Sequence, residues 1–345
     1  MPAPDSSALL QVRDLTIAFP HATVVHGINF DIAAGETLAL VGESGCGKSI
    51  TAFALMRLLP PTARIAGGRV MFDGADLAAA SPRALRDIRG RRISLILQEP
   101  MTSLNPVLTV GYQVAEVLRR HERLSAPAAR HRVVELFDLV GIPDPGRRYD
   151  EFPHHFSGGM RQRVMIAMAV ACNPQLIIAD EPTTALDVTI QAQVLDLLDR
   201  LRHQLGMALL LITHDLNVVA QWADRVAVMY AGRIMEEAPA ATFFAQPMHP
   251  YAQGLLAASV DHDGQRHYTT DRLTEIPGSV RSAASEPGCP FAPRCPLVQP
   301  ACREAPIPPL QVADGRRVSC ILARGAGDTS SDRIIREGRD VAAFG

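Results

Sequence analysis

Residues 42–49, GESGCGKS, match the phosphate-binding pattern G-x-x-x-x-G-K-[ST] at every fixed position. They follow an apolar run at 37–41 that predicts a buried strand, and they precede residues 50–59, which predict a helix. Glycines let successive backbone N–H groups face a phosphate, and the helix N-terminus adds the positive end of its dipole. We expect Lys48 to reach the β- and γ-phosphates and Ser49 to bind Mg²⁺. The sequence therefore predicts a nucleotide site formed by Gly42, Glu43, Ser44, Gly45, Cys46, Gly47, Lys48, Ser49 and Ile50.

Composition narrows the class of protein. The chain of 345 residues is long enough for one large domain and a smaller additional segment, and its 47% hydrophobic residues are enough to form a core. The net charge of −2 argues against a surface that coats nucleic acid. Residues 1–10 lack the basic and apolar regions of a signal peptide, and the longest apolar runs are too short to span a membrane. We therefore expect a soluble, cytoplasmic protein.

The pattern of apolar residues predicts an α/β fold. Alternation at 10–19, 27–32 and 67–73 predicts antiparallel strands, and residues 91–98 also have strand character. From about 100 to 172 the apolar spacing is helical, most clearly at 110–121 and 126–141. Apolar strands return at 176–179, 208–212 and 226–230, with a helix predicted at 190–205. Such alternation of strands and helices favours a parallel sheet covered by helices, into which the helical block is inserted.

Two carboxylates end the apolar strand predicted at 176–179. An acidic residue at the carboxyl end of a buried strand beside a phosphate loop is the expected Mg²⁺ ligand, and Asp180 has this position. Glu181 follows, where a second carboxylate would orient and deprotonate an attacking water. An isolated Asp-Glu pair is more often a solvated turn, but the residues PTTALD at 182–187 make this combination far more specific.

A third motif, FSGGMRQR at 156–163, lies far downstream of the phosphate loop. Together the three motifs resemble those of ABC transporter ATP-binding subunits, over about residues 10–251. The resemblance implies an ATPase with a P-loop NTPase (RecA-like) core, an antiparallel β subdomain and an inserted helical subdomain. It also implies that Ser157, Gly158 and Gly159 bind the γ-phosphate of ATP held by a second subunit. Met160 and Phe156 stand where many members have Gln and Leu, and neither change removes a backbone donor.

Other positions match the family residue by residue. Gln98 resembles the glutamine that senses Mg²⁺ and the attacking water, and residues 99–106 resemble the segment that touches the permease. His214 resembles the histidine that contacts the γ-phosphate, and Asp187 the acid that communicates between the two sites. Phe19 stands where the family places an aromatic ring on adenine, with core packing as the alternative.

The C-terminal part is rich in proline and cysteine. Nine prolines lie in residues 277–309. The spacing of Cys289, Cys295, Cys302 and Cys320 fits neither the common zinc modules nor the ferredoxins. Disulfides are not expected in a reducing cytoplasm, so the spacing leaves a metal site and scattered thiols open. The segment resembles the C-terminal extension of the oligopeptide/dipeptide branch of these ATPases. That resemblance implies a [4Fe–4S] cluster on the four cysteines, with zinc or metal-free thiols as alternatives.

The resemblance also implies an organisation and a role. We expect an ABC ATP-binding domain at 8–258, the extension at 259–325 and a flexible tail at 326–345. The chain would hydrolyse ATP to drive an importer of di- or oligopeptides from the cytoplasmic face of the inner membrane, although some relatives carry nickel. Its partners would be a second ABC ATPase, in a heterodimer or homodimer, two permease subunits and an extracytoplasmic solute-binding protein, without nucleic acid.

Two other functions remain open at this point. A non-transport ABC ATPase of DNA repair, chromosome structure or translation is disfavoured, because the 58 residues between Gln98 and Ser157 lack sustained heptads and the chain has one cassette. A regulator whose C-terminal cysteines sense redox state is compatible with transport.

Overall fold

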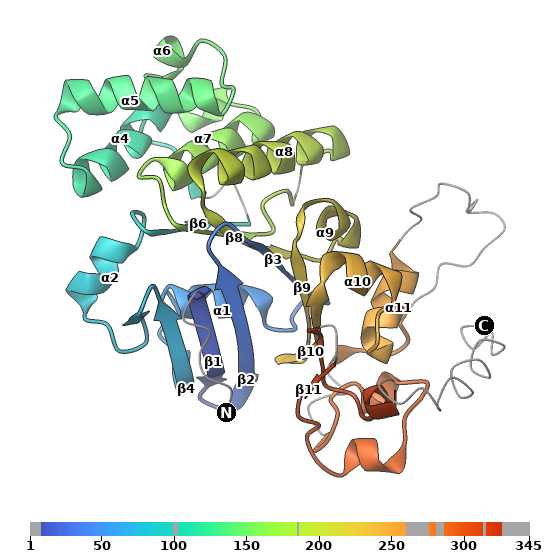
Figure 1. Ribbon diagram of the computed structural model, residues 1–345. Helices are drawn as coiled ribbons and strands as arrows, with labels where there is room; N and C mark the ends of the chain where they lie inside the picture. Colours follow the sequence, from blue (N-terminus) through green and yellow to red (C-terminus); the bar gives the residue numbers. More distant parts are fainter. Residues whose placement is uncertain are drawn as a thin grey trace.

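The protein is described by a computed structural model of residues 8–98, 103–184, 186–259, 276–280, 286–312 and 315–325. Figure 1 shows a central sheet with helices at one end, a second sheet beside it and the C-terminal segment packed along one edge. This arrangement confirms the predicted α/β class.

The central sheet is built around short apolar strands. Its order is β11-β12-β10-β9-β3-β8-β7-β6, and the five strands from β9 to β6 are parallel. These five are Arg225–Tyr230 (β9), Thr37–Val41 (β3), Ala208–Thr213 (β8), Leu176–Asp180 (β7) and Ile93–Ile96 (β6). Every residue of β3, β7 and β8 is buried, as expected for parallel strands covered on both faces. The parallel order places the carboxyl ends of β3, β7 and β8 together.

The second sheet is antiparallel and contains strands in the order β2-β1-β4-β5. Its strands are Ala22–Ala33 (β2), Ala8–Phe19 (β1), Arg64–Phe72 (β4) and Ala75–Asp76 (β5). The strand predicted at 27–32 is real but begins five residues earlier. Residues 22–26 are mostly exposed or half-buried, so they show no apolar alternation, and their pairing with β1 extends the strand.

Helices of the region 110–170 form a separate layer. They are α4 (Val110–His121), α5 (Ala126–Leu139), α6 (Pro145–Arg148) and α7 (Gly158–Val170). Thr109, Ser125 and Ser157 cap α4, α5 and α7, because each side chain accepts a hydrogen bond from a backbone N–H of the first turn. One apolar core joins them to α8 (Val188–Leu205), which confirms the predicted helical block.

The remaining helices flank the sheets. They are α1 (Lys48–Leu55), α2 (Pro82–Ile88), α9 (Leu216–Trp222), α10 (Ala240–Ala245) and α11 (Pro250–Ala258). Among the described residues, no helix has both the length and the apolar character needed to cross a membrane.

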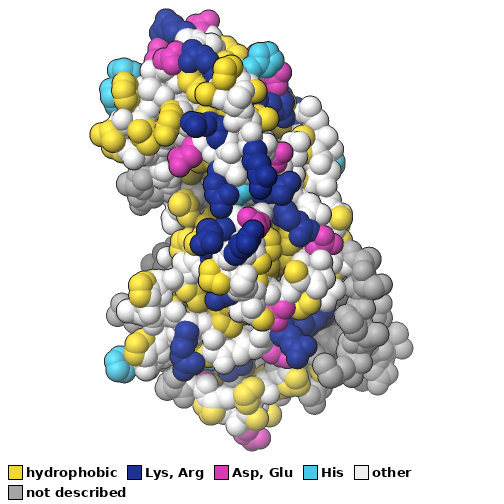
Figure 2. Space-filling view, turned by 90° about the vertical axis from the view of Figure 1, so that its left-hand side faces the viewer, with side chains coloured by type: hydrophobic (Ala, Val, Ile, Leu, Met, Phe, Trp, Pro, Cys, Tyr) yellow, Lys and Arg dark blue, Asp and Glu magenta, His cyan; other side chains and the backbone are white. Residues whose placement is uncertain are grey.

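Positive charge gathers on one face of the molecule. Figure 2 shows a band of basic side chains across the middle of this face. Arg91, Arg120 and Arg123 line a shallow hollow near the ends of α2 and α4, where Glu122 pairs with Arg91 at 3.6 Å. The net charge of −2 therefore conceals a local excess of positive charge.

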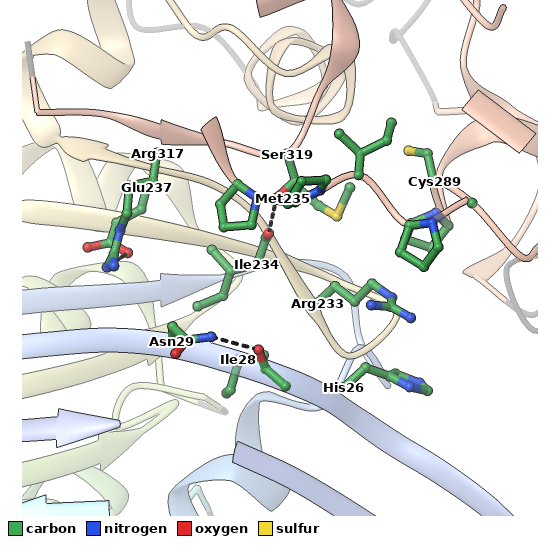
Figure 3. Close-up of a pocket in the computed structure, with 17 residues that line it drawn as sticks. His26, Ile28, Asn29, Arg233, Ile234, Met235, Glu237, Cys289, Arg317 and Ser319 are labelled. Carbon is green, nitrogen blue, oxygen red and sulfur yellow. Dashed lines mark hydrogen bonds and ion pairs between the residues drawn. The ribbon is translucent and has the colours of Figure 1, made fainter. Parts of the chain in front are cut away.

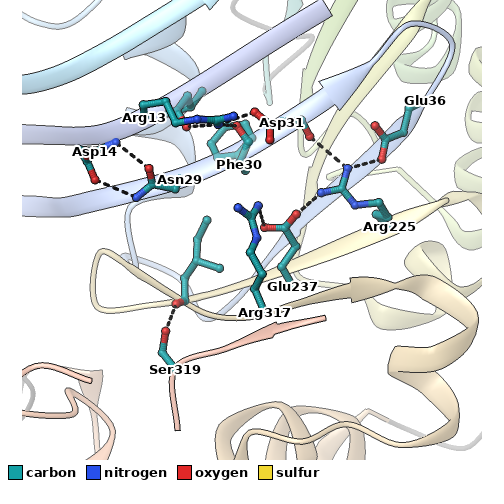
Figure 4. Close-up of polar contacts among 12 residues, drawn as sticks. Arg13, Asp14, Asn29, Phe30, Asp31, Glu36, Arg225, Glu237, Arg317 and Ser319 are labelled. Atoms are coloured by element: carbon teal, nitrogen blue, oxygen red, sulfur yellow. Dashed lines mark hydrogen bonds and ion pairs between the residues drawn. The ribbon is translucent and has the colours of Figure 1, made fainter. Parts of the chain in front are cut away.

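The C-terminal segment extends the central sheet. Strand β12 (Arg317–Val318) pairs antiparallel with β10 (Arg233–Pro239), and β11 (Leu310–Gln311) pairs with β12. Figure 4 shows Glu237 of β10 accepting from Arg225 of β9 and Arg317 of β12. This buried carboxylate joins three strands through two guanidinium groups, so the extension is bonded to the sheet by side chains as well as backbone.

A cavity and an aromatic cluster mark the seam between the extension and the rest of the chain. The cavity has a volume of about 210 Å³ and lies between β2, β10 and the extension, as Figure 3 shows. Beside the seam, the ring of Phe291 lies 5.4 Å from that of Tyr230 and 5.3 Å from that of Tyr251. The predicted domain limits 8–258 and 259–325 stay predictions, and the tail predicted at 326–345 lies outside the described residues.

Replacing Phe291 with Ala should loosen the extension, because the buried ring packs against residues of both β9 and α11. We expect a loss of about 3–5 kcal/mol in local packing free energy and earlier protease cleavage after residue 286. Limited proteolysis with thermal unfolding measures both effects. The control Leu297→Ala removes an exposed side chain of the same segment and should change stability by less than about 0.5 kcal/mol. Equal protease resistance of Phe291→Ala and the unmodified chain would contradict this packing role.

Candidate nucleotide-binding and hydrolysis site

The phosphate-binding loop runs from the end of β3 to the first residue of α1 and depends on two glycines. Gly42 has φ +153°, and a Cβ there would lie 2.1 Å from the carbonyl oxygen of Met229 in β9. Gly47 has φ +109° at the N-cap of α1. Any other residue would be strained at both positions, so the path of the loop depends on these two glycines.

Lys48 and Ser49 open α1 inside this loop. The Lys48 ammonium is almost fully buried and donates to the carbonyl oxygens of Gly42, at 2.7 Å, and Glu43, at 3.1 Å. The Ser49 hydroxyl donates to Asp180 Oδ1 at 3.1 Å. Burial raises the pKa of Asp180, and the hydrogen bond from Ser49 opposes this effect. Because Mg²⁺ prefers such oxygen donors, these two side chains fit the predicted magnesium site.

Three residues predicted to act in hydrolysis meet at one carboxylate. Glu181 Oε2 accepts from Gln98 Nε2 at 2.8 Å, and Oε1 accepts from His214 Nδ1 at 3.2 Å. Thr184 adds a third donor, whose hydroxyl lies 2.9 Å from Oε2. Glu181 itself has φ +46°, an uncommon backbone conformation for a residue other than glycine. The ends of β6, β7 and β8 thus bring together residues separated by up to 116 positions.

The same contacts control the charge of Glu181. Burial raises the pKa of this carboxyl, but the hydrogen bonds from Thr184 and His214, together with the charges of His214 and Lys48, leave the pKa below its usual value. Glu181 is therefore ionised at neutral pH, as a group that accepts a proton from water must be.

The signature Ser157-Gly158-Gly159 lies apart from this cluster. Ser157 accepts a hydrogen bond from Met160 N–H at 3.3 Å and so begins α7. A Cβ on Gly159 would lie 2.8 Å from the Ile190 side chain, so this end of α7 packs against α8. Asp187 caps α8 by accepting from Ile190 N–H at 2.9 Å. Within the described part of the chain, the close neighbours of the signature belong to α7, α8 and the turn before α8, not to the phosphate loop.

Phe19 ends β1, opposite Ala22 in β2, and is half-buried. The same hairpin reaches the phosphate loop, because Val24 O and a Val25 methyl both lie 3.3 Å from where a Cβ of Gly47 would stand. Stacking of Phe19 on adenine stays a prediction. Of the segment 99–106 predicted to touch a permease, residues 99–102 lie outside the described residues.

The four C-terminal cysteines lie close enough to affect one another electrostatically. Burial raises the pKa of Cys289 to about 11, and the nearby thiols of Cys295, Cys320 and Cys302 add to this rise. Each sulfur also has a backbone N–H neighbour, as Cys302 Sγ has Gln299 N–H at 3.5 Å. Within the described ranges, no three His, Cys, Asp or Glu side chains are gathered closely enough to hold one metal ion.

Sequence reasoning missed two residues that contact the phosphate loop. The Tyr251 hydroxyl accepts from Glu43 N–H at 3.0 Å, and Arg294 donates to both carboxylate oxygens of Glu43 at 3.0 and 2.9 Å. Arg294 directly precedes Cys295, but nothing in that local sequence indicates a contact 251 positions away.

The fold and these motifs define an ATP-binding cassette ATPase. A family profile described as "ABC transporter" matches residues 25–184, and one described as "Oligopeptide/dipeptide transporter, C-terminal region" matches residues 235–302. A dimeric ATP-binding cassette in a post-hydrolysis state, with ADP and Pi, superposes with a TM-score of 0.60 at 28% identity, over 67% of this chain and 98% of that one. A component of an ABC transporter complex from Clostridium perfringens gives the same TM-score and identity over 70% and 92%.

Curated relatives extend the similarity over most of the chain. A dipeptide transport ATP-binding protein of Bacillus subtilis is 48% identical over 322 residues, 91% of this chain and 94% of that protein. A probable peptide ABC transporter ATP-binding protein of Sinorhizobium fredii is 49% identical over 92% and 96%. An oligopeptide transport ATP-binding protein of Salmonella typhimurium is 48% identical over 91% and 94%. The chain belongs to the ABC transporter family of ATP-binding subunits, in its oligopeptide/dipeptide branch.

Replacing Glu181 with Gln should slow ATP hydrolysis by about 10²–10⁴-fold, because the amide keeps the size of the side chain but cannot accept the proton. ATP binding should persist. Retention of radiolabelled ATP by the protein measures binding directly. The control Glu135→Gln changes a surface carboxylate on α5 and should hydrolyse normally. Normal turnover by Glu181→Gln would exclude the role as base.

Proposed function

We propose that this chain is the ATP-hydrolysing subunit of a peptide importer and that the carboxylate of Glu181 is the general base. The observation that carries the catalytic part is the convergence of Gln98, Thr184 and His214 on that one carboxylate. The importer part is supported by the match of residues 235–302 to the oligopeptide/dipeptide C-terminal region and by the names of the relatives. Di- and oligopeptides are the proposed solutes.

Each residue then has a distinct task in hydrolysis. The backbone of 42–49 and the ammonium of Lys48 hold the phosphates, which requires Lys48 to leave the carbonyl oxygens of Gly42 and Glu43. Ser49 and Asp180 hold Mg²⁺, which neutralises charge on the phosphate oxygens when bound. Glu181 takes a proton from water, Gln98 orients that water, and His214 contacts the γ-phosphate.

The position of the signature supports an ATP site shared between two chains. Ser157 caps α7, and the N–H groups of its first turn offer an anion site that the phosphate loop of the same chain does not contact. We propose that a second ABC ATPase, in a heterodimer or a homodimer, brings its ATP to this helix end. Two permease subunits and an extracytoplasmic solute-binding protein complete the assembly, and the chain acts at the cytoplasmic face of the inner membrane.

Changing Ser157 to Arg should stop hydrolysis at the ATP held by the partner chain, while ATP still binds to the loop of the mutated chain. Ser125→Arg is the matched control, since Ser125 caps α5 through the same kind of hydrogen bond outside the signature. Both variants lose a helix cap worth about 1 kcal/mol, so their stabilities should match. Hydrolysis at each site of a mixed complex is measured separately. A defect confined to the mutated chain's own loop would contradict the shared site.

We further propose that Cys289, Cys295, Cys302 and Cys320 hold a [4Fe–4S] cluster. Their mutual electrostatic contact and backbone N–H neighbours support this, because such hydrogen bonds tune cluster sulfurs. The four cysteines would bind as thiolates, whose negative charges the iron–sulfur core would offset.

Protein purified without oxygen should be brown and contain about four irons and four sulfides per chain. Cys302→Ser should remove the colour and expose residues 286–323 to protease, because the ligand bonds would no longer join these turns. Cys172→Ser is the control, since Cys172 follows α7 and stands apart from the C-terminal segment. Colourless anaerobic protein with bound zinc would assign a structural zinc site, and metal-free protein with a protease-resistant extension would refute both metals.

A further inference from the structure

Arg294 brings a buried positive charge from the C-terminal extension to the phosphate loop. Its side chain is 4% exposed, and Nη1 donates to both oxygens of the Glu43 carboxylate. Glu43 is the second residue of the loop and its carboxylate belongs to a side chain that is 27% exposed. Because the guanidinium is buried and the carboxylate is only partly exposed, salt screens this ion pair less than it screens the surface pairs elsewhere in the chain.

The guanidinium is held so that one nitrogen faces the loop. Nε donates to the carbonyl of Pro277 at 2.7 Å, and Nη2 donates to that of Ile276 at 2.8 Å. The remaining nitrogen faces Glu43 and lies 3.3 Å from the Tyr230 hydroxyl. Every nitrogen of the group is engaged, so its direction is determined by the extension rather than by the loop.

Glu43 is held from three sides at once. Its N–H donates to Tyr251, its carbonyl accepts from Lys48, and its carboxylate accepts from Arg294. The Glu43 carbonyl accepts from the Lys48 ammonium, which is the group expected to bind the phosphates. A change in the position of Glu43 would therefore change the position of this ammonium. A free carboxylate at this position would also repel a triphosphate in the same loop.

We propose that Arg294 is a positioning residue for ATP binding: it neutralises and holds Glu43, so that the extension sets the affinity of the phosphate loop. The proposal rests on the nucleotide role given above to residues 42–49. It also means that the extension is coupled to the ATP site, because η3 (Ala292–Arg294) ends directly before Cys295. Loss of order around the cysteines would then weaken ATP binding through Arg294.

The test is a double-mutant cycle on the full chain. Arg294→Met should raise the Kd and KM for ATP about tenfold and change kcat less than about twofold, because it leaves an unpaired carboxylate beside the phosphates but no change at Glu181. Glu43→Gln in the same chain should restore most of the affinity, since it removes the uncompensated charge. A purely structural role for Arg294 would show no such rescue. Retention of radiolabelled ATP over a range of concentrations gives the Kd.

Three controls make the outcome decisive. Arg303→Met breaks an ion pair with Glu286 in the same extension and should leave ATP affinity unchanged. Lys48→Ala, assayed by retention of radiolabelled ATP, must lose binding, and its failure to do so would refute the nucleotide site rather than the role of Arg294. If Arg294→Met does not fold, Arg294→Lys, which keeps the charge without the fork, should show a smaller loss that Glu43→Gln also restores. Unchanged affinity, or no rescue, would overturn the proposal.

Discussion

The close approach of the phosphate loop to β9 is the constraint on which the rest of the site depends. A side chain at Gly42 would collide with the Met229 carbonyl, so the loop leaves β3 in close contact with the backbone of β9, the neighbouring strand. Gly232, in the turn after β9, donates from its backbone to the Cys46 carbonyl at 2.8 Å and closes the other side. The loop is therefore held by backbone atoms on both sides before any side chain contributes.

The proposed site residues lie in two parts of the fold, one at the ends of the central strands and one on α7. The carboxyl ends of β3, β6, β7 and β8 gather the ammonium, the magnesium ligands and Glu181, whereas α7 presents the signature from the helical layer. A compact sheet positions the first group within hydrogen-bond distance. The signature stands in the helical layer, which shares one apolar core with the faces of β6, β7 and β8 that it covers.

Much of this arrangement follows from local sequence, and some of it does not. The helix predicted at 110–121 from apolar spacing has the same bounds in the structure, where Thr109 caps its first turn. The beginning of β2 was missed, since its first residues show no alternation and owe their conformation to pairing with β1. Glu181 was predicted from its place after a buried strand, and Gln98 and His214 from the family resemblance, but their contacts with one carboxylate were not predicted. The pair of Glu43 and Arg294 was missed because two common charged residues so far apart carry no local signal.

The short strand β12 of the C-terminal extension pairs with β10 of the central sheet. It covers the hydrogen-bonding edge of β10, and β11 covers β12 in turn. The solved dimeric cassette aligns over nearly all of its own length but only 67% of this chain. Removing the extension would uncover the backbone of β10 at Glu236 and Glu237, together with the rings of Tyr230 and Tyr251 that pack against Phe291. An open strand edge offers its backbone groups for pairing with other chains, and β12 occupies this edge at Glu236 and Glu237.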